Sequence, residues 1–309
     1  MVEQTTVLSV ENLVVDYGKG AKKHRAVNDI SFSVNPGECV GFIGANGAGK
    51  STTMKALMGF IFPTSGSVRL FGKTAQDSSC RQRIGYLPEV ALYYPFMKAK
   101  ELLQLYGGLH GLNSVELRTR IPKTLERVGL GGKDNILLKN FSKGMQQRLG
   151  IAQAIIAEPE ALIFDELSSG LDPVGRFDLR DVLIDLKQQG RTIFFSSHEL
   201  SEVESLCDRV IMIHQGKIVT QATVEELMKP LNQFQVVFRL PGDSALPALI
   251  SQQNPTRQGD QFTLQIADVS LYAETMTQLS AFKAEIVSTE SKTRSLEEYF
   301  IELVRNHNG

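Results

Sequence analysis

A glycine-rich loop between an apolar strand and a helical segment places the strongest constraint on this chain. Residues 39–43 are apolar, residues 44–51 read Gly-Ala-Asn-Gly-Ala-Gly-Lys-Ser, and a helical pattern covers 50–58. The loop fits the spacing GxxxxGK[ST] in the strand, loop and helix order that this pattern requires. Glycine permits backbone conformations in which successive N–H groups turn inward onto an anion. The sequence therefore predicts a phosphate-binding loop at the start of a helix.

Individual residues of this loop have distinct expected tasks. Lys50 is expected to bridge the β- and γ-phosphates of a nucleotide, and the Ser51 hydroxyl to bind Mg²⁺. The helix N-terminus adds its partial positive charge. A flexible turn with an incidental lysine is the alternative, which the flanking strand and helix disfavour. The candidate nucleotide-binding residues here are Gly44, Asn46, Gly47, Ala48, Gly49, Lys50, Ser51 and Thr52.

Two adjacent acids follow a second apolar strand. Residues 161–164 predict a central parallel strand, and Asp165 and Glu166 come directly after it. Because the carboxyl ends of such strands open onto the ligand crevice, we expect Asp165 to hold Mg²⁺ and Glu166 to orient and polarise the attacking water. Acids in this place can also cap a helix or lie in solvent. Beside a phosphate loop, the Mg²⁺ interpretation is favoured.

Strand patterns alternate with helical patterns along the chain, which indicates an α/β fold with a parallel sheet covered on both faces. The first two strands have no helix between them, so we expect an antiparallel hairpin at one edge. Residues 98–157 are mostly helical and predict a helical insertion. The expected strands are 7–15, 26–34, 38–43, 67–71, 161–164, 192–195, 209–214 and 217–220, and the expected helices are 50–58, 101–109, 115–128, 146–157, 174–189 and 200–206.

A second, smaller α/β unit is expected after Pro230. We predict a core domain over residues 5–230, a junction at 231–233, and a small C-terminal domain over 232–309. The smaller domain contains no phosphate-binding or metal-ligand pattern, so it is expected to be accessory to catalysis. Its expected strands are 234–239, 262–266 and 284–289, and its expected helices are 246–252, 271–279 and 296–304.

Charge and cysteine content limit the classes of function. Lys and Arg total 33 against 34 Asp and Glu, so a basic, general nucleic-acid binder is not expected. The three cysteines, Cys39, Cys80 and Cys207, have no zinc-type spacing and predict reduced thiols in the cytosol. No signal-peptide pattern is present, and no apolar run reaches the ~18 residues that a membrane span needs. We expect a soluble chain that reaches a membrane only through a partner.

Three further segments, together with the loop and the acids, identify a family. The run 140–148 reads Asn-Phe-Ser-Lys-Gly-Met-Gln-Gln-Arg, the run 169–172 reads Ser-Gly-Leu-Asp, and His198 follows a buried strand. Each segment alone is weak, since a Ser-x-Gly before a helix is usually a cap. In this order, residues 5–228 resemble the ATP-binding-cassette (ABC) ATPases, whose cassette carries a P-loop fold, an antiparallel β-subdomain and a helical subdomain.

The resemblance implies a role for several residues. Tyr17 matches the aromatic residue that stacks on adenine, and packing at a strand end is its other interpretation. Ser142 and Gly144 match the signature loop, which in this family binds the γ-phosphate held by the opposite protomer. Asp172 matches the loop that crosses the dimer interface, and His198 the switch histidine that contacts the γ-phosphate. Spacing alone leaves open a chain in which Ser142 returns to its own phosphate loop.

The chain departs from the family pattern at several positions. Leu167 stands where a proline often follows the catalytic acid, and Lys143 and Met145 alter the signature. Glu89 stands where glutamine is usual, on the loop between core and helical insertion. A carboxylate binds Mg²⁺ more strongly than an amide, so we expect Glu89 to be a Mg²⁺-dependent coupling residue and not the base. Alternatively, Glu89 is a solvated loop acid. The basic run 19–25 is interpreted as a solvated turn.

Details of the motifs resemble the branch of the family that energises exporters. Members often end in Ser-Leu-Glu-x-x-Phe, which residues 295–300 match, although a capping box explains the same residues. The resemblance implies ATP and Mg²⁺ as cofactors, a homodimer or a dimer with a close paralogue, and separate membrane permease subunits. It places the chain on the cytoplasmic face of a membrane.

Two other functions remain as alternatives. A soluble ABC ATPase acting on nucleic acid or ribosomes usually has two cassettes or a long coiled coil, and this chain has neither pattern. A non-hydrolytic scaffold is disfavoured because Lys50, Asp165, Glu166 and His198 are all present.

Overall fold

The computed structural model describes residues 6–18, 20–168, 170–228, 230–241, 246–293 and 295–307. The chain divides into two compact units, residues 1–224 and 225–309. Each unit has its own hydrophobic core. Residues 231–233, expected as a junction, lie within a strand of the second unit.

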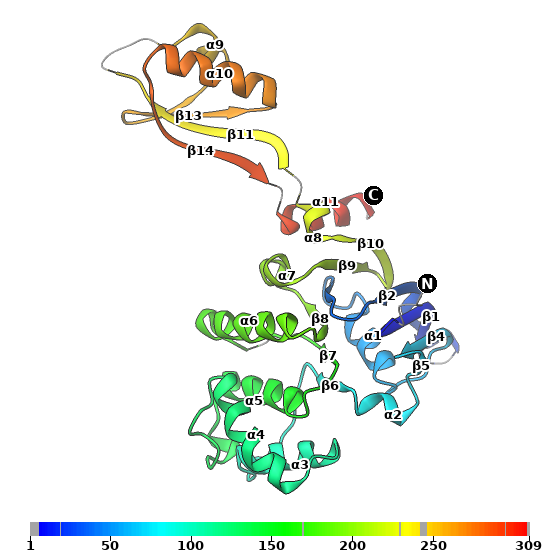
Figure 1. The fold of residues 1–309 in the computed structure, drawn as a ribbon. Coiled ribbons are helices and arrows are strands. Elements are labelled where there is room, and N and C mark those ends of the chain that lie inside the picture. Colours follow the sequence, from blue (N-terminus) through cyan, green and yellow to red (C-terminus); the bar gives the residue numbers. More distant parts are fainter. Residues whose placement is uncertain are drawn as a thin grey trace, which may run out of the picture. The chain divides into compact units, whose positions relative to one another are not determined.

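A six-stranded sheet forms the centre of the first unit (Figure 1). Its order is β10-β9-β3-β8-β7-β6, and every neighbouring pair is parallel except β10 with β9. The expected parallel sheet is confirmed, whereas β6 was not expected. The strands are β3 (Cys39–Ile43), β6 (Ile84–Leu87), β7 (Ala161–Phe164), β8 (Thr192–Ser197), β9 (Arg209–His214) and β10 (Lys217–Thr223).

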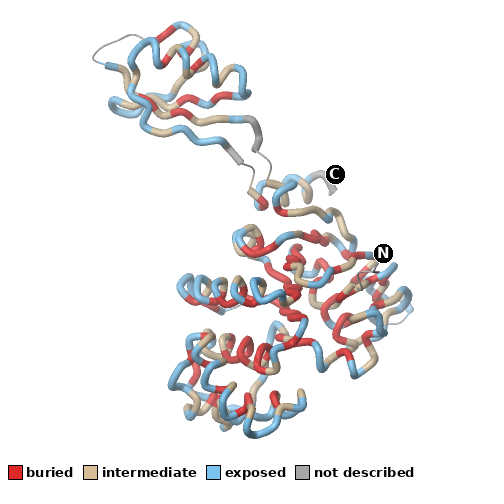
Figure 2. The backbone as a smooth tube through the Cα atoms, in the orientation of Figure 1, coloured by how far each residue is buried: buried red, intermediate tan, exposed pale blue. Residues whose placement is uncertain are grey.

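Layers on both faces bury the central strands, as the continuous apolar runs predict. Every residue of β3, β7 and β8 is buried (Figure 2). On one face Phe42 and Phe194 contact Phe32, with ring centroids 5.7 and 5.5 Å from it. On the other face a Cβ on Gly41 would lie 2.7 Å from Val203 Cγ1, so glycine lets a helix approach closely.

The first two strands form the expected antiparallel hairpin, with Tyr17 opposite His24. This pairing is confirmed, but the hairpin belongs to a separate four-stranded sheet of order β2-β1-β4-β5, not to an edge of the parallel sheet. In the basic run, Lys23 and Arg25 pair with Asp16, and Lys19 lies outside the described residues. The strands are β1 (Leu8–Tyr17), β2 (His24–Val34), β4 (Ser65–Leu70) and β5 (Lys73–Thr74).

Helices of the first unit follow their caps. Asn113 and Glu116 form a capping box at the start of α4, and Asp172 caps α6 ahead of Pro173. The expected helical insertion is confirmed as α3, α4 and α5. The helices are α1 (Lys50–Leu57), α2 (Ser78–Arg81), α3 (Ala99–Leu109), α4 (Ser114–Arg127), α5 (Lys143–Ile155), α6 (Pro173–Gln188) and α7 (Leu200–Leu206), with 3-10 turns at Gly20–Lys22 and Leu138–Asn140.

The second unit is a four-stranded antiparallel sheet with helices on one face. Its order is β12-β13-β11-β14, and its core includes Val236, Phe238 and Leu264. The expected strands and helices are present, and the short strand β12 was missed. The elements are α8 (Val224–Leu227), at the division between the units, then β11 (Pro230–Arg239), α9 (Ala248–Gln252), β12 (Thr256–Gln258), β13 (Gln261–Ile266), α10 (Val269–Ala281), β14 (Glu285–Thr293) and α11 (Leu296–His307).

Candidate functional site

The glycine-rich loop joins β3 to α1 in a conformation that its glycines make possible. Gly49 has a φ of 112°, and a Cβ there would lie 2.7 Å from the Ala26 carbonyl oxygen. A Cβ on Gly44 would lie 2.3 Å from the Ile213 carbonyl oxygen. Side chains at these two positions would therefore push the loop away from β2 and β9. The loop is held as a tight turn at the start of a helix.

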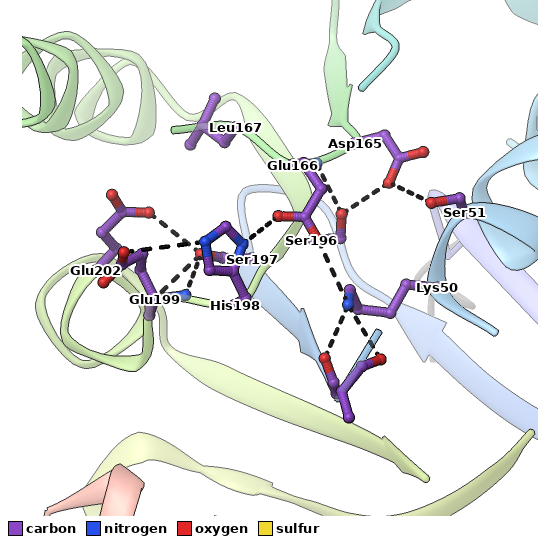
Figure 3. Close-up of polar contacts among 12 residues, drawn as sticks. Lys50, Ser51, Asp165, Glu166, Leu167, Ser196, Ser197, His198, Glu199 and Glu202 are labelled. Atoms are coloured by element: carbon purple, nitrogen blue, oxygen red, sulfur yellow. Dashed lines mark hydrogen bonds and ion pairs between the residues drawn. The ribbon is translucent and has the colours of Figure 1, made fainter. Parts of the chain in front are cut away.

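Lys50 is almost fully buried and has its ammonium group at this loop (Figure 3). Its Nζ donates to the carbonyl oxygen of Gly44 at 2.8 Å and to that of Ala45 at 3.4 Å. It also lies 3.4 Å from Oε1 of Glu166. Because a buried charge needs polar partners, these contacts fix where the positive charge lies.

Asp165 connects the helix after the loop to the strand beside its own. Its Oδ1 accepts from the hydroxyls of Ser51 at 3.3 Å and Ser196 at 2.8 Å. Burial raises the pKa of Asp165, the two hydroxyl bonds lower it, and the charges of Glu89 and Glu166 raise it further. The site therefore presents a buried carboxylate beside a hydroxyl, a pair of hard oxygen ligands that suits Mg²⁺.

Glu166 adopts a left-handed backbone conformation, with a φ of 54°. Such a conformation is rare for a residue of this size and persists only where its surroundings hold it. The backbone N–H of Glu166 donates to Ser196 Oγ at 2.8 Å. The carboxylate meets His198, whose Nδ1 lies 2.6 Å from Oε2, while Oε1 is the atom near Lys50 (Figure 3). The strained turn thus orients the Glu166 carboxylate toward both the Lys50 ammonium group and the His198 ring.

A cleft of about 360 Å³ opens beside these residues. Tyr17 is 41% exposed at this cleft, and its hydroxyl donates to Thr52 Oγ1 at 3.5 Å. Sequence reasoning missed two site residues: His24, which lines the cleft opposite Tyr17 in the hairpin, and Ser196, which bonds Asp165. The cleft is lined by Tyr17, His24, Ala26, Asn46, Gly47, Gly49, Lys50, Ser51, Thr52, Glu89 and Glu166.

Ser142, Gly144 and Asp172 lie elsewhere and do not line this cleft. Ser142 caps α5 by accepting from the backbone N–H of Met145 at 3.2 Å. A Cβ on Gly144 would lie 3.6 Å from Leu171, so the start of α5 packs against the loop before α6. Ser169 of that loop lies outside the described residues. Within one chain, the structure brings the two predicted dimer segments together but does not bring them to the phosphate loop.

A second, larger cleft of about 890 Å³ lies between the core and the helical insertion. It contains exposed apolar side chains, among them Leu92 (91% exposed), Leu109 and Phe60. Contiguous exposed apolar surface of this kind commonly marks an interaction site. Pro88, which precedes Glu89, lines the same cleft. A segment bound here would therefore lie next to the loop that carries Glu89.

Two further findings concern metals and membranes. Among the described residues, no group of three or more His, Cys, Asp or Glu side chains gathers as a metal site. No helix in the described part of the chain has the length and hydrophobicity to span a bilayer.

Comparison with known proteins agrees with this geometry. The family model described as ABC transporter matches residues 27–169. The chain is 34% identical to the bacitracin transport ATP-binding protein BcrA of Enterococcus faecalis, over 96% of each protein. It is 35% identical to the Nod factor export ATP-binding protein I of Ralstonia nicotianae, over 74% of this chain and 70% of that protein.

A solved structure extends the similarity to three dimensions. An ATP-binding subunit of an ABC transporter is similar with a TM-score of 0.65 and 32% identity, over 72% of this chain and 92% of that one. Identity above 30% across nearly the whole length of a transporter ATP-binding protein defines the family. The chain belongs to the ATP-binding proteins of ABC transporters, the ATP-binding-cassette ATPases.

Proposed function

We propose that this chain binds MgATP in the cleft beside Lys50 and hydrolyses it as the ATPase subunit of an exporter whose membrane subunits are separate chains. The observation that carries the proposal is one contact network. Lys50 and His198 both contact Glu166, while Asp165 contacts Ser51. These groups come from two parallel strand ends and one helix start, the place where such sheets bind ligands.

The residues present suit a nucleoside triphosphate and a magnesium ion. The glycine-bounded loop and the start of α1 offer backbone N–H groups to phosphate oxygens, and Lys50 supplies a fixed positive charge. Tyr17, which lines the cleft, would stack on the base. Ser51, Asp165 and Glu89 would hold Mg²⁺, which when bound neutralises charge that develops on the phosphate oxygens.

Glu166 would orient the attacking water and accept its proton. Its carboxylate is buried on the side of Lys50 and His198, so its position is set before the reaction begins. His198 would stabilise the γ-phosphate and keep Glu166 aimed through the 2.6 Å contact. Because an ionised carboxylate can only accept a hydrogen bond, this contact requires the proton on Nδ1 of His198. Glu89, which also lines the cleft, would respond to the bound metal and not act as the base.

A second copy of the chain would complete each site. Ser142, Gly144 and Asp172 do not line the cleft of their own chain, so their predicted phosphate and interface contacts require a partner protomer. Ser142 accepts a hydrogen bond from the start of α5, and this helix start offers further N–H groups to an anion. We therefore propose two ATP molecules between two protomers, each protomer supplying half of both sites.

The apolar cleft beside α3 would receive a segment of the membrane subunit. Relatives of this chain are named as transport and export subunits, and the chain has no described helix that could cross a membrane itself. Movement of that segment would reach the nucleotide through the loop that carries Pro88 and Glu89. The named relatives favour this function over a soluble ATPase acting on nucleic acid.

The cleft gives a direct test. Leu92→Cys places a reactive thiol inside it, and Val115→Cys places one on the helical insertion outside it, at 91% and 71% exposure. The three native cysteines are buried and react slowly. With a thiol-linked photo-crosslinker in membranes of cells expressing the full chain, the first variant should give a nucleotide-sensitive adduct with a polytopic membrane protein. Equal adducts from both variants, or none, would contradict the assignment.

A further inference from the structure

Glu202 is a half-buried carboxylate that the site described above does not use. It lies in the first turn of α7 and faces the back of the His198 turn (Figure 3). Burial raises its pKa, while hydrogen bonds from Ser168 and Ser197 and the charge of Arg176 act in the opposite direction. A carboxylate withdrawn from water in this way needs several polar partners.

Its polar neighbours come from the two turns that carry the proposed catalytic residues. Ser197 Oγ donates to Glu202 Oε2 at 3.2 Å, and Ser197 directly precedes His198. Ser168, two residues after Glu166, lies close enough to the same carboxylate to lower its pKa. The Glu202 side chain therefore holds the turn after β8 by a hydrogen bond and lies beside the turn after β7.

The His198 turn is tied on its other side as well. The backbone N–H of Glu199 donates to Ser197 Oγ at 2.9 Å. The Glu199 carboxylate pairs with Arg176 at 2.7 Å, and Arg176 Nε donates to the Leu171 carbonyl oxygen at 3.4 Å. The Glu199–Arg176 pair is about one third exposed on each side, and such pairs contribute little on their own.

We propose that Glu202 is a positioning residue for ATP hydrolysis, which acts through Glu166 and His198 by fixing the two turns relative to each other. This inference rests on the proposed function of that pair. Glu166 has a strained backbone, and its contact with His198 is 2.6 Å long. A strained turn keeps its geometry only when neighbouring groups over-determine it. Glu202 supplies that restraint for both turns at once.

Steady-state ATP hydrolysis by the full-length chain tests the proposal. Glu202→Ala removes the acceptor for the Ser197 hydroxyl and the carboxylate beside Ser168, so kcat should fall about 10-fold or more, because small misplacements of a catalytic group cost up to about 100-fold. The KM for ATP should stay within about 2-fold, since the phosphate loop is untouched. Glu202→Gln keeps an acceptor of the same length and should recover most of the rate.

A separate route reaches the same contact from the donor side. Ser168→Ala should reproduce part of the loss in kcat. Ser205→Ala is the matched control: this serine is exposed on α7, and among the described residues its Oγ donates only to the backbone carbonyl oxygen of Glu202. A helix-stability role alone would lower the melting temperature of Glu202→Ala and leave kcat per folded molecule unchanged, which would overturn the proposal.

The ring resonances of His198 give a readout that does not depend on activity. The chain has five histidines, so ¹H–¹⁵N spectra of histidine-labelled protein can be assigned with His198→Gln. Glu202→Ala should shift the His198 ring signals, whereas Ser205→Ala should not. Unchanged His198 signals in folded Glu202→Ala would refute the positioning role. If Glu202→Ala shifts the His198 signals but the wild-type chain has no ATPase activity, the proposed function is refuted and the contact is not.

Discussion

Nδ1 of His198 lies 2.6 Å from Oε2 of Glu166, so the two side chains share a hydrogen bond across two neighbouring strand ends. Either partner alone would be an ordinary polar group. Together they form an acid–base pair whose carboxylate also contacts the buried Lys50. These two contacts hold the Glu166 carboxylate in one orientation.

Glu166→Gln should separate binding from hydrolysis. The amide keeps the shape of the side chain but cannot accept a proton, so hydrolysis should slow by about 100-fold or more. Affinity for MgATP should be retained, because the substitution removes one negative charge from the site and leaves Asp165 unchanged. Gel filtration with saturating MgATP should show an accumulated dimer. A variant that remains monomeric, alone and with its membrane partner, would contradict the two-protomer site.

Lys50→Ala should weaken nucleotide binding itself. Loss of a charge-assisted contact to phosphate should reduce affinity about 10- to 100-fold. Lys55→Ala provides the matched control, since Lys55 lies in the same helix and is exposed. Titration of a fluorescent ATP analogue measures both variants. Equal affinities for the two would show that Lys50 does not contact the phosphates.

Glu89→Gln should preserve substantial ATPase activity and shift its Mg²⁺ requirement to higher concentration, because an amide is a weaker ligand for a hard cation. Glu89→Ala should uncouple hydrolysis from transport. Activity measured across a Mg²⁺ titration distinguishes these effects. If Glu89→Gln abolished hydrolysis as fully as Glu166→Gln, the assignment of the base to Glu166 would be wrong.

Ser196→Ala should damage both stability and hydrolysis. The fully buried hydroxyl donates to Asp165 and accepts from the Glu166 N–H, both at 2.8 Å. Leaving a buried partner unpaired costs about 1–3 kcal/mol. Urea unfolding should show this loss against a Ser205→Ala control, and kcat should fall more than ATP affinity. An unchanged unfolding midpoint would mean that water replaces the hydroxyl.

Removal of residues 225–309 should leave nucleotide binding intact. The phosphate loop, Asp165, Glu166 and His198 all lie in the first unit, which has its own core. We expect the truncated chain to bind ATP with unchanged affinity and to lose stable association with the membrane subunits. Calorimetry and co-purification measure the two properties. Loss of nucleotide affinity in a truncated chain that remains folded would make the second unit part of the site.

The sequence by itself determined the elements whose signals are local. The glycine-rich loop, the apolar strand before Asp165 and the caps of α4 and α6 each depend on neighbours in the chain. The short strand β6 gave no such signal. It has four residues, including Gly85, where a Cβ would lie 2.0 Å from the Ala154 carbonyl oxygen. Its strand state depends on pairing with β7 and packing against α5, which no local pattern encodes.

Only the tertiary structure decided which groups meet. Ser196 looks unremarkable in sequence, yet the parallel pairing of β7 with β8 brings its hydroxyl to 2.8 Å from Oδ1 of Asp165. The same fold holds Ser142 away from the cleft of its own chain. Such contacts join residues far apart in the chain, so they depend on strand order and packing. Sequence supplied the chemical groups, and long-range packing set the distances between them.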